Sequence, residues 1–163
     1  MSDQPQILDR IEADHDRQRK LLDQLAETTG DSEERRKLFT ELTKELKGHA
    51  AAEEQALYSA MLADPDVNDE TRHSVAEHHE IDEMLNDLAA TDMASSGWLN
   101  KFHSFADRYR HHINEVEEDH FPDFEKEIDE AMDKDMTSTF DERKKAEYEA
   151  AEVTPEKAEN AKE

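Results

Sequence analysis

The sequence predicts an all-α protein, organised as an up-down-up-down antiparallel four-helix bundle with a C-terminal polar tail. Three Gly and four Pro among 163 residues are too few for an all-β protein, which needs many tight turns. Apolar side chains also recur at helical spacing along four long segments. Only short polar breaks separate these segments, and short connections make successive helices antiparallel neighbours.

The first two helices are expected over about residues 4–27 and 32–62. Gly30 ends the first, and Asp31 or Ser32 caps the second. The apolar positions of the first helix are Ile7, Leu8, Ile11, Leu22 and Leu25. Those of the second are Leu38, Phe39, Leu42, Leu46, Leu57 and Met61. Each set lies on one face, so each helix contributes a stripe to a shared core.

The third and fourth helices are expected over about residues 68–90 and 98–128. The Asp-Pro-Asp of residues 64–66 and the Ser-Ser-Gly of residues 95–97 provide the breaks before them. Their apolar positions are Val75, Ile81, Leu85 and Leu88 in the third, and Phe102, Phe105, Tyr109, Ile113 and Val116 in the fourth. Pro122 lacks an amide hydrogen, so it should bend or divide the fourth helix.

The apolar pattern fades near the C-terminus, which divides the chain into a bundle over residues 1–132 and an acidic tail over residues 133–163. Phe140 and Tyr148 offer one weak helical face, so the tail is expected to be partly helical. Beyond Thr154-Pro155 the composition is polar and predicts disorder.

Composition and charge exclude several classes of function. The chain carries 20 Lys and Arg against 44 Asp and Glu, a formal net charge of −24, which disfavours nucleic acid and anionic membranes as partners. It has no Cys, so disulfides, thiolate metal sites and Cys nucleophiles are excluded. No Gly-rich phosphate loop, secretory signal or membrane-spanning run is visible. We therefore expect a cytoplasmic monomer or small homo-oligomer whose protein partner, if any, the sequence does not name.

Histidines on the inward faces are the most informative feature. Counting about 100° per residue turns His15, His49, His78 and His112 toward the core, one from each predicted helix. Glu53 follows His49 by four positions, so the two side chains project side by side. Burying such groups without a charge partner would cost several kcal/mol each. A pair of metal ions would supply that charge, and imidazole with carboxylate suits iron, manganese or zinc.

Helix 4 adds further candidates on the same reasoning. Glu117 lies five residues after His112, and the two flank the apolar stripe. Tyr109, one turn before His112, is in reach of a bound oxygen species, although core packing is the simpler interpretation. His120 is a boundary residue or a peripheral ligand. Three other histidines are interpreted as surface or edge residues: His73, His79 and His103.

Four short motifs occur in order along the predicted helices. They are Asp14-His15, His49-Ala-Ala-Ala-Glu53-Glu54, Glu77-His78-His79-Glu80 and His111-His112-Ile-Asn-Glu-Val-Glu117. Over about residues 5–130 this ordered set resembles the hemerythrin-like family, also called the HHE cation-binding domain. The resemblance implies an oxo- or hydroxo-bridged centre of two iron ions that meets dioxygen. The implied ligands are His15, His49, Glu53, His78, His112 and Glu117, with Glu53 and Glu117 as bridges.

Three positions leave the ligand set open. Oxygen-carrying hemerythrins have a second His four residues after the first on helix 3, where this chain has Asp82, so reversible oxygen carriage is not implied. His111 with Glu115 offers the four-residue spacing of bacterial relatives as an alternative to His112 with Glu117. Glu54 is an alternative to Glu53.

The function expected from this set is binding of, or reaction with, dioxygen, peroxide or nitric oxide, in sensing or in oxidative and nitrosative stress handling. A weak peroxide-disproportionating or iron-oxidising activity is compatible with it. The alternative is a non-catalytic module that stores or buffers iron, or that signals.

Overall fold

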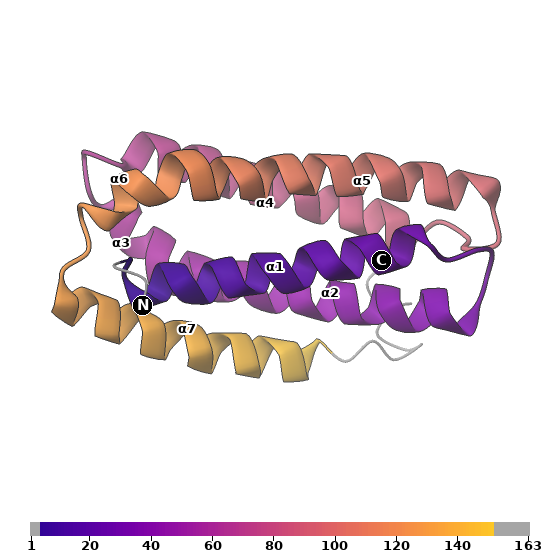
Figure 1. Cartoon of the computed structure of the whole chain (residues 1–163), viewed down its shortest axis with the longest axis horizontal. Helices are drawn as coiled ribbons and strands as arrows, with labels where there is room; N and C mark the ends of the chain where they lie inside the picture. Colours follow the sequence, from indigo (N-terminus) through magenta and orange to yellow (C-terminus); the bar gives the residue numbers. More distant parts are fainter. Residues whose placement is uncertain (1–3, 152–163) are drawn as a thin grey trace.

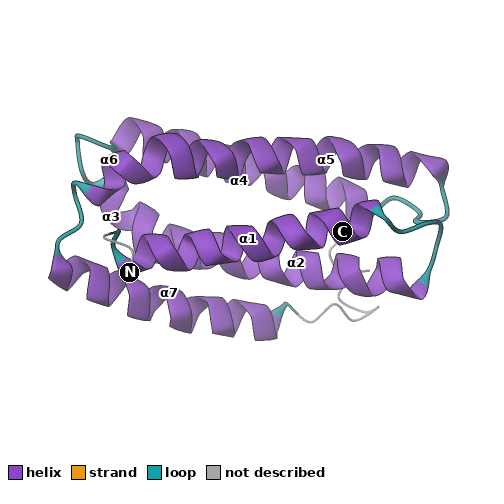
Figure 2. Ribbon diagram, viewed as in Figure 1, coloured by secondary structure: helices purple, strands orange, loops and turns teal. Residues whose placement is uncertain are grey.

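Helices account for nearly all of residues 4–151, the part of the chain that the computed structural model describes (Figure 1). Five helices are long: α1 (Gln6–Ala26), α2 (Glu33–Glu53), α4 (Asn68–Ala89), α5 (Ser96–Glu115) and α7 (Glu130–Ala150). Two are short: α3 (Ser59–Leu62) and α6 (Phe121–Glu125). Figure 2 shows helices and loops only within the described residues, so the predicted all-helical class is confirmed.

Two wider, π-helical turns interrupt otherwise continuous rods. The first π-turn, Glu54–Tyr58, joins α2 to α3, and the second, Val116–His120, joins α5 to α6. In each, an amide donates to the carbonyl five residues earlier: Ser59 to Glu54, and Phe121 to Val116. Such turns are rare and concentrate at functional sites. They change the angular spacing of the residues that follow the inward His of each rod.

The helix ends have the expected local causes. Gly30 adopts a positive φ of 59°, a conformation that L side chains rarely adopt, and it separates α1 from α2. The Ser32 hydroxyl accepts from the Arg35 amide and caps α2, while the Ser95 hydroxyl accepts from the Gly97 amide at the start of α5.

The core consists of two apolar clusters, one towards each end of the bundle. One is built around Trp98, Phe102 and Leu42, and the other around Ile11, Leu57 and Phe124. Along α1, the α2 rod and α4, buried polar side chains such as Gln18, His49 and His78 lie between the residues of these two clusters, whereas Thr28 and Arg35 lie at the Trp98 end. The fold therefore places a polar layer in the middle of an apolar core.

Helix α7 is a packed fifth helix, where the sequence predicted a partly helical tail. Its Phe140 is buried in the second apolar cluster, and the ring lies 6.0 Å from that of His49. Gly48 on α2 permits the approach, because a Cβ there would meet the Lys144 backbone oxygen at 3.3 Å. The weak apolar pattern around Phe140 therefore corresponds to a helix face that is buried in the structure. The predicted disorder beyond Pro155 lies outside the described residues.

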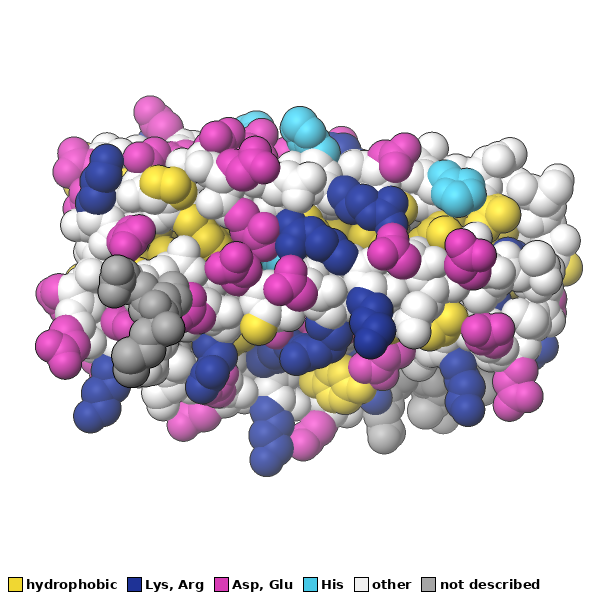
Figure 3. Space-filling view, in the orientation of Figure 1, with side chains coloured by type: hydrophobic (Ala, Val, Ile, Leu, Met, Phe, Trp, Pro, Cys, Tyr) yellow, Lys and Arg dark blue, Asp and Glu magenta, His cyan; other side chains and the backbone are white. Residues whose placement is uncertain are grey.

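Charged side chains cover the outside. Figure 3 shows Asp and Glu interspersed with Lys and Arg over one face of the bundle, with small apolar areas between them. No helix of the described chain is both long and apolar enough to cross a membrane.

Candidate metal centre

Four helices direct buried ligand-type side chains to one level of the bundle. These are His15 from α1, His49 and Glu53 from α2, His78 from α4, and His112 from α5. We call these five residues the central cluster. They are five of the six ligands that the sequence pattern proposed, and they come from helices that are far apart in the chain.

The central cluster contains two sets of three ligands that share Glu53. One set is His15, His49 and Glu53, and the other is Glu53, His78 and His112; within each, the ligand atoms lie within 4.8 Å of one another. Glu53 Oε2 lies 3.4 Å from His49 Nε2, and Glu53 Oε1 lies 3.1 Å from His78 Nε2. The two carboxylate oxygens thus face different sets, which is the arrangement of a carboxylate that bridges two cations.

Three further carboxylates fix the orientation of the imidazoles. Each bond joins Nδ1 of a histidine to one carboxylate. His15 donates to Glu117 at 2.8 Å, His49 donates to Asp14 at 2.9 Å, and His112 donates to Glu77 at 2.9 Å. We call Asp14, Glu77 and Glu117 the outer carboxylates. A proton held at Nδ1 leaves the Nε2 lone pair free for a metal, which is the usual arrangement around bound metal ions.

Each outer carboxylate is in turn bound by a basic side chain. Lys144 lies 2.6 Å from Asp14, Arg108 lies 2.8 Å from Glu77, and Arg19 lies 2.8 Å from Glu117. Burial alone would raise the pKa of Glu77, but hydrogen bonds from His112 and Arg108 outweigh it and lower that pKa to about 2. The outer carboxylates are therefore ionised acceptors at neutral pH.

The interior of the cluster has unsatisfied polar atoms that fit a cation. Glu53 is 0% exposed, and neither of its carboxylate oxygens has a hydrogen-bond partner among the described residues; nor has Nε2 of His15. Burial opposes ionisation of Glu53, but His49 and His78 outweigh it and hold its pKa well below the usual value. A buried anion of this kind requires positive charge beside it. The residues present therefore fit metal ions.

The charge balance inside the cluster supports the same interpretation. Burial opposes protonation of His49, but Glu53 and Asp14 outweigh it and raise the pKa of His49 to about 10. At His78 burial again opposes protonation, but the carboxylate of Glu53 outweighs it and raises the pKa of His78 to about 8. For His112 burial prevails and lowers the pKa to about 4. The field of Glu53 thus attracts positive charge to the place where both ligand sets meet.

Glu117 occupies a different place from the one the sequence suggested. The expectation was a second bridging carboxylate. In the structure its oxygens bind His15 Nδ1 and Arg19, at the opposite edge of the imidazole from the ligand set with Glu53. Arg19 and His15 together hold the side chain there, at the rim of the bundle.

The alternative ligands lie outside the central cluster. His111 is 70% exposed on the outer face of α5, beside Glu115. Glu54 is half-exposed, with its carboxylate 3.5 Å from Nδ1 of His78. Asp82 is also half-exposed and pairs with Lys47 at 3.4 Å. The structure therefore brings together His112 and Glu53 rather than His111 and Glu54.

The sequence predicted no role for three residues near the cluster. Asp14 and Glu77 precede inward histidines in the chain, but each binds a histidine of another helix, which sequence spacing does not reveal. Tyr58 lies five residues after Glu53, across the first π-turn, and its ring centroid is 5.3 Å from that of His78. Its buried hydroxyl has no hydrogen-bond partner among the described residues. A helical wheel drawn at a constant 100° per residue does not predict this position of Tyr58.

A small cavity adjoins the cluster. It has a volume of about 40 Å³, and its lining includes His49, His78 and Tyr109, with Lys47 and Asp82 on the solvent side. This volume is enough for a water-sized molecule, which needs about 10–15 Å³ by this type of measure. The Tyr109 hydroxyl donates to Gln18, so it is already committed to a partner.

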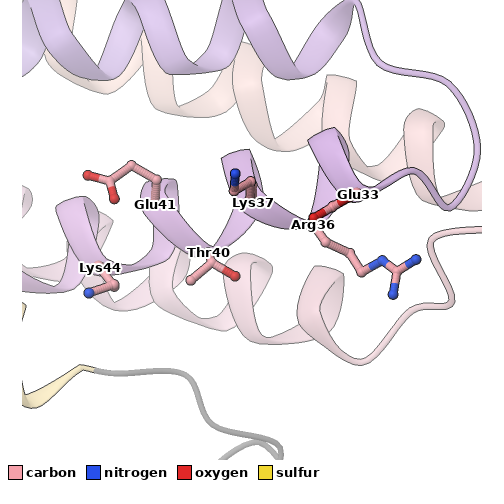
Figure 4. A pocket seen from close by; sticks show the side chains of 6 residues that line it. All are labelled: Glu33, Arg36, Lys37, Thr40, Glu41 and Lys44. Atoms are coloured by element: carbon pink, nitrogen blue, oxygen red, sulfur yellow. The ribbon is translucent and has the colours of Figure 1, made fainter.

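A separate hollow on α2 has a different character. It is open and about 550 Å³, and Figure 4 shows its side chains spread along the outer face of the helix. Its lining residues are Glu33, Arg36, Lys37, Thr40, Glu41 and Lys44. None of these is a histidine, and the lining carries both acidic and basic side chains, so the small cavity is the one that belongs to the metal centre.

Comparison with known proteins agrees with this geometry. Residues 6–124 match the model of a protein family described as the hemerythrin HHE cation binding domain. Among solved structures, the crystal structure of a hemerythrin HHE cation binding domain-containing protein from Mycobacterium kansasii is similar. It is 24% identical, with 90% of each chain covered and a TM-score of 0.73. That likeness shows a common fold. No curated protein matches the chain.

Proposed function

The chain belongs to the hemerythrin HHE cation-binding family, and from this premise we propose that it is a non-haem di-iron protein that binds or reacts with dioxygen, peroxide or nitric oxide. The observation that carries the proposal is the shared carboxylate. Glu53 belongs to both sets of three ligands and presents one oxygen to each. A single-ion site would not need a second set of imidazoles on the other side of the same carboxylate.

The donor atoms suit iron. Imidazole and carboxylate ligands without thiolate suit iron, manganese and zinc, and a shared carboxylate holds two such ions close together. His15 and His49 would hold one ion, His78 and His112 the other, and Glu53 both. When bound, iron supplies the redox chemistry that no side chain of this cluster has.

The surroundings of the cluster favour a small ligand. Three protein ligands per ion leave coordination positions open, as catalytic metal sites do. The cavity beside His49 and His78 has a volume of about 40 Å³, which favours a diatomic molecule or peroxide over larger substrates. Asp82 stands where oxygen carriers have a further His. Its carboxylate forms an ion pair with Lys47, and both residues line that cavity. This openness favours reaction with peroxide or oxygen over reversible carriage.

The first experiment measures metal content and the optical spectrum of protein purified in air from iron-supplemented cells. We expect about two irons per chain, one per ligand set, and absorption of an oxo-bridged centre near the ultraviolet edge. Glu53→Gln should lose most of the iron, because it removes the shared anion. Glu34→Gln is the matched control, since Glu34 is an exposed carboxylate on the same helix, and it should retain the iron.

Addition of reductant, and then of oxygen or peroxide, separates the functions. A spectrum that cycles with oxygen would favour binding or sensing, and peroxide consumption would favour an enzyme. Bound iron that responds to neither would indicate iron buffering. Folded, colourless, metal-free protein would overturn the di-iron assignment.

A further inference from the structure

A second group of histidines surrounds a single carboxylate on the outside of the bundle. Nε2 of His73, on α4, lies 2.9 Å from Glu115 Oε1, and Nε2 of His120 lies 3.6 Å from the same oxygen. Nε2 of His111 lies 3.7 Å from the other oxygen of Glu115. We call these four residues the outer histidine cluster. Within the described residues, Glu115 has ion pairs with imidazoles and with no Lys or Arg.

The second π-turn creates this arrangement. Glu115 is the last residue of α5, and His120 is the last residue of the π-turn, five positions later. In a regular α-helix, residues five apart point in clearly different directions, whereas a hydrogen bond from i to i+5 brings them closer to one face. The His120 side chain is buried, and its Nδ1 lies 2.9 Å from the Ser74 hydroxyl. That contact leaves Nε2 facing Glu115.

The geometry differs from that of an ordinary surface ion pair. His79 and Glu83, on α4, form such a pair at 3.2 Å, with both side chains exposed and no second imidazole involved. In the outer histidine cluster, one carboxylate oxygen faces two imidazoles, one of them buried and 3.6 Å away, which is beyond a normal hydrogen bond. His120 Nε2 therefore faces the same carboxylate oxygen as His73 Nε2 without forming a hydrogen bond to it.

The outer histidine cluster is accessible and adjacent to the metal centre. The His73 side chain is 54% exposed, so an ion from solvent reaches it directly. Glu77 Oε1 lies 3.5 Å from His73 Nε2 and accepts from His112 Nδ1 at 2.9 Å. The other oxygen of Glu77 binds Arg108, so Glu77 serves as a link between the two clusters and is not free as a full ligand.

We propose that His73, His120 and Glu115 form an additional, solvent-accessible site for one divalent first-row transition-metal ion. Two imidazoles and one carboxylate are a ligand set that such ions accept, with water completing the coordination. His111 lies close enough to join as a further ligand after rotation of its exposed side chain. The site does not depend on the proposed di-iron function, because none of its ligands belongs to the central cluster.

The test uses Zn²⁺ as the probe on the full chain as isolated, with its resident metals quantified first. Isothermal titration calorimetry is expected to show one additional Zn²⁺ per chain, and zinc-edge X-ray absorption is expected to show imidazole ligands. His73→Ala and Glu115→Gln should each weaken this Zn²⁺ binding by at least about tenfold. His79→Ala is the matched control, since it removes a histidine from an ordinary ion pair on the same helix, and it should bind Zn²⁺ like the wild type.

Two further measurements keep the outcome unambiguous. Adding His73→Ala to the Glu53→Gln variant should remove one further Zn²⁺ per chain, which separates this site from the emptied centre. Melting curves followed by circular dichroism verify that each variant is folded; His73 is exposed, so its variant is expected to melt like the wild type. The proposal is overturned if His73→Ala binds as much Zn²⁺ as the wild type. Zn²⁺ uptake matched by release of resident metal would overturn it equally.

Discussion

Single residues outside the central cluster are expected to affect how tightly it binds metal. The outer carboxylate Glu77 holds His112 through Nδ1 and is itself held by Arg108. Removing its charge weakens the hydrogen bond to Nδ1 of His112 and lowers the basicity of that imidazole as a ligand. We therefore predict that Glu77→Gln weakens metal affinity by about 10- to 100-fold in a chelator competition assay.

The matched control for this variant is Glu80→Gln. Glu80 lies on the same helix and binds the same Arg108, but it is exposed and touches no imidazole of the central cluster. Equal losses in the two variants would show that Arg108, and not the bond to His112, is what matters.

The raised pKa of Glu70 predicts that the stability of the folded protein depends on pH. Partial burial, followed by the nearby carboxylates of Asp123 and Asp119, raises the pKa of Glu70 to about 7 from a usual value of 4.5. The folded state thus binds this proton more tightly than the unfolded state does. Its contribution to stability is fully present below pH 4.5 and is lost as the pH rises through 7. Glu70→Gln should therefore raise the melting temperature at pH 8 and leave it nearly unchanged at pH 4.5. An equal increase at both pH values would exclude titration as the cause.

Sequence spacing identified the inward histidines because a helical wheel assigns each residue to a face. It gave no information about which side chains from other helices meet there. Glu117 illustrates this limit of sequence spacing. Its carboxylate was expected to point inward and bridge two metal ions, yet Arg19 on α1 binds it at the rim of the bundle. The partners of Asp14 and Glu77 were hidden for the same reason, because helix packing and not sequence order creates those contacts.

At the scale of the helices, the four long segments were predicted closely, because Gly30, Pro65 and Ser95 mark their ends with definite backbone chemistry. The π-turns were not predicted. A π-turn adds one residue within a single turn, and a helical wheel drawn at a constant 100° per residue does not include that extra residue. It nevertheless decides the neighbours of Glu53 and Glu115.

Helix α7 is expected to stabilise both the bundle and the metal centre. Phe140 is 1% exposed and packs on the His49 ring, while Lys144 binds the Asp14 that orients the same imidazole. Phe140→Ala should lower the free energy of unfolding by about 3–5 kcal/mol in urea titrations, because it leaves a cavity in the second apolar cluster. Glu142→Ala, on the exposed face of α7, should change it by less than about 0.5 kcal/mol. A Phe140→Ala loss no larger than that of Glu142→Ala would show that α7 is only loosely attached.

At the scale of the whole molecule, charge repulsion is the main long-range force. The net charge of −24 means that acidic side chains far outnumber the cations available to pair with them. Screening should weaken this repulsion more than it weakens the surface ion pairs, which contribute little individually. We predict that the melting temperature rises when NaCl is increased from about 0.01 to 0.5 M. The same rise with tetramethylammonium chloride would identify screening, whereas a rise with Mg²⁺ alone would indicate specific cation binding instead.

The polar layer between two apolar clusters has a consequence for how the ions are exchanged. The α1, α2, α4 and α5 rods have residues in both clusters, the one around Trp98 and the one around Phe124. Local opening of a protein favours the regions with the fewest apolar contacts. We therefore expect the middle of the bundle to open locally more readily than its two ends. Metal ions would then enter and leave through the middle without global unfolding of the chain.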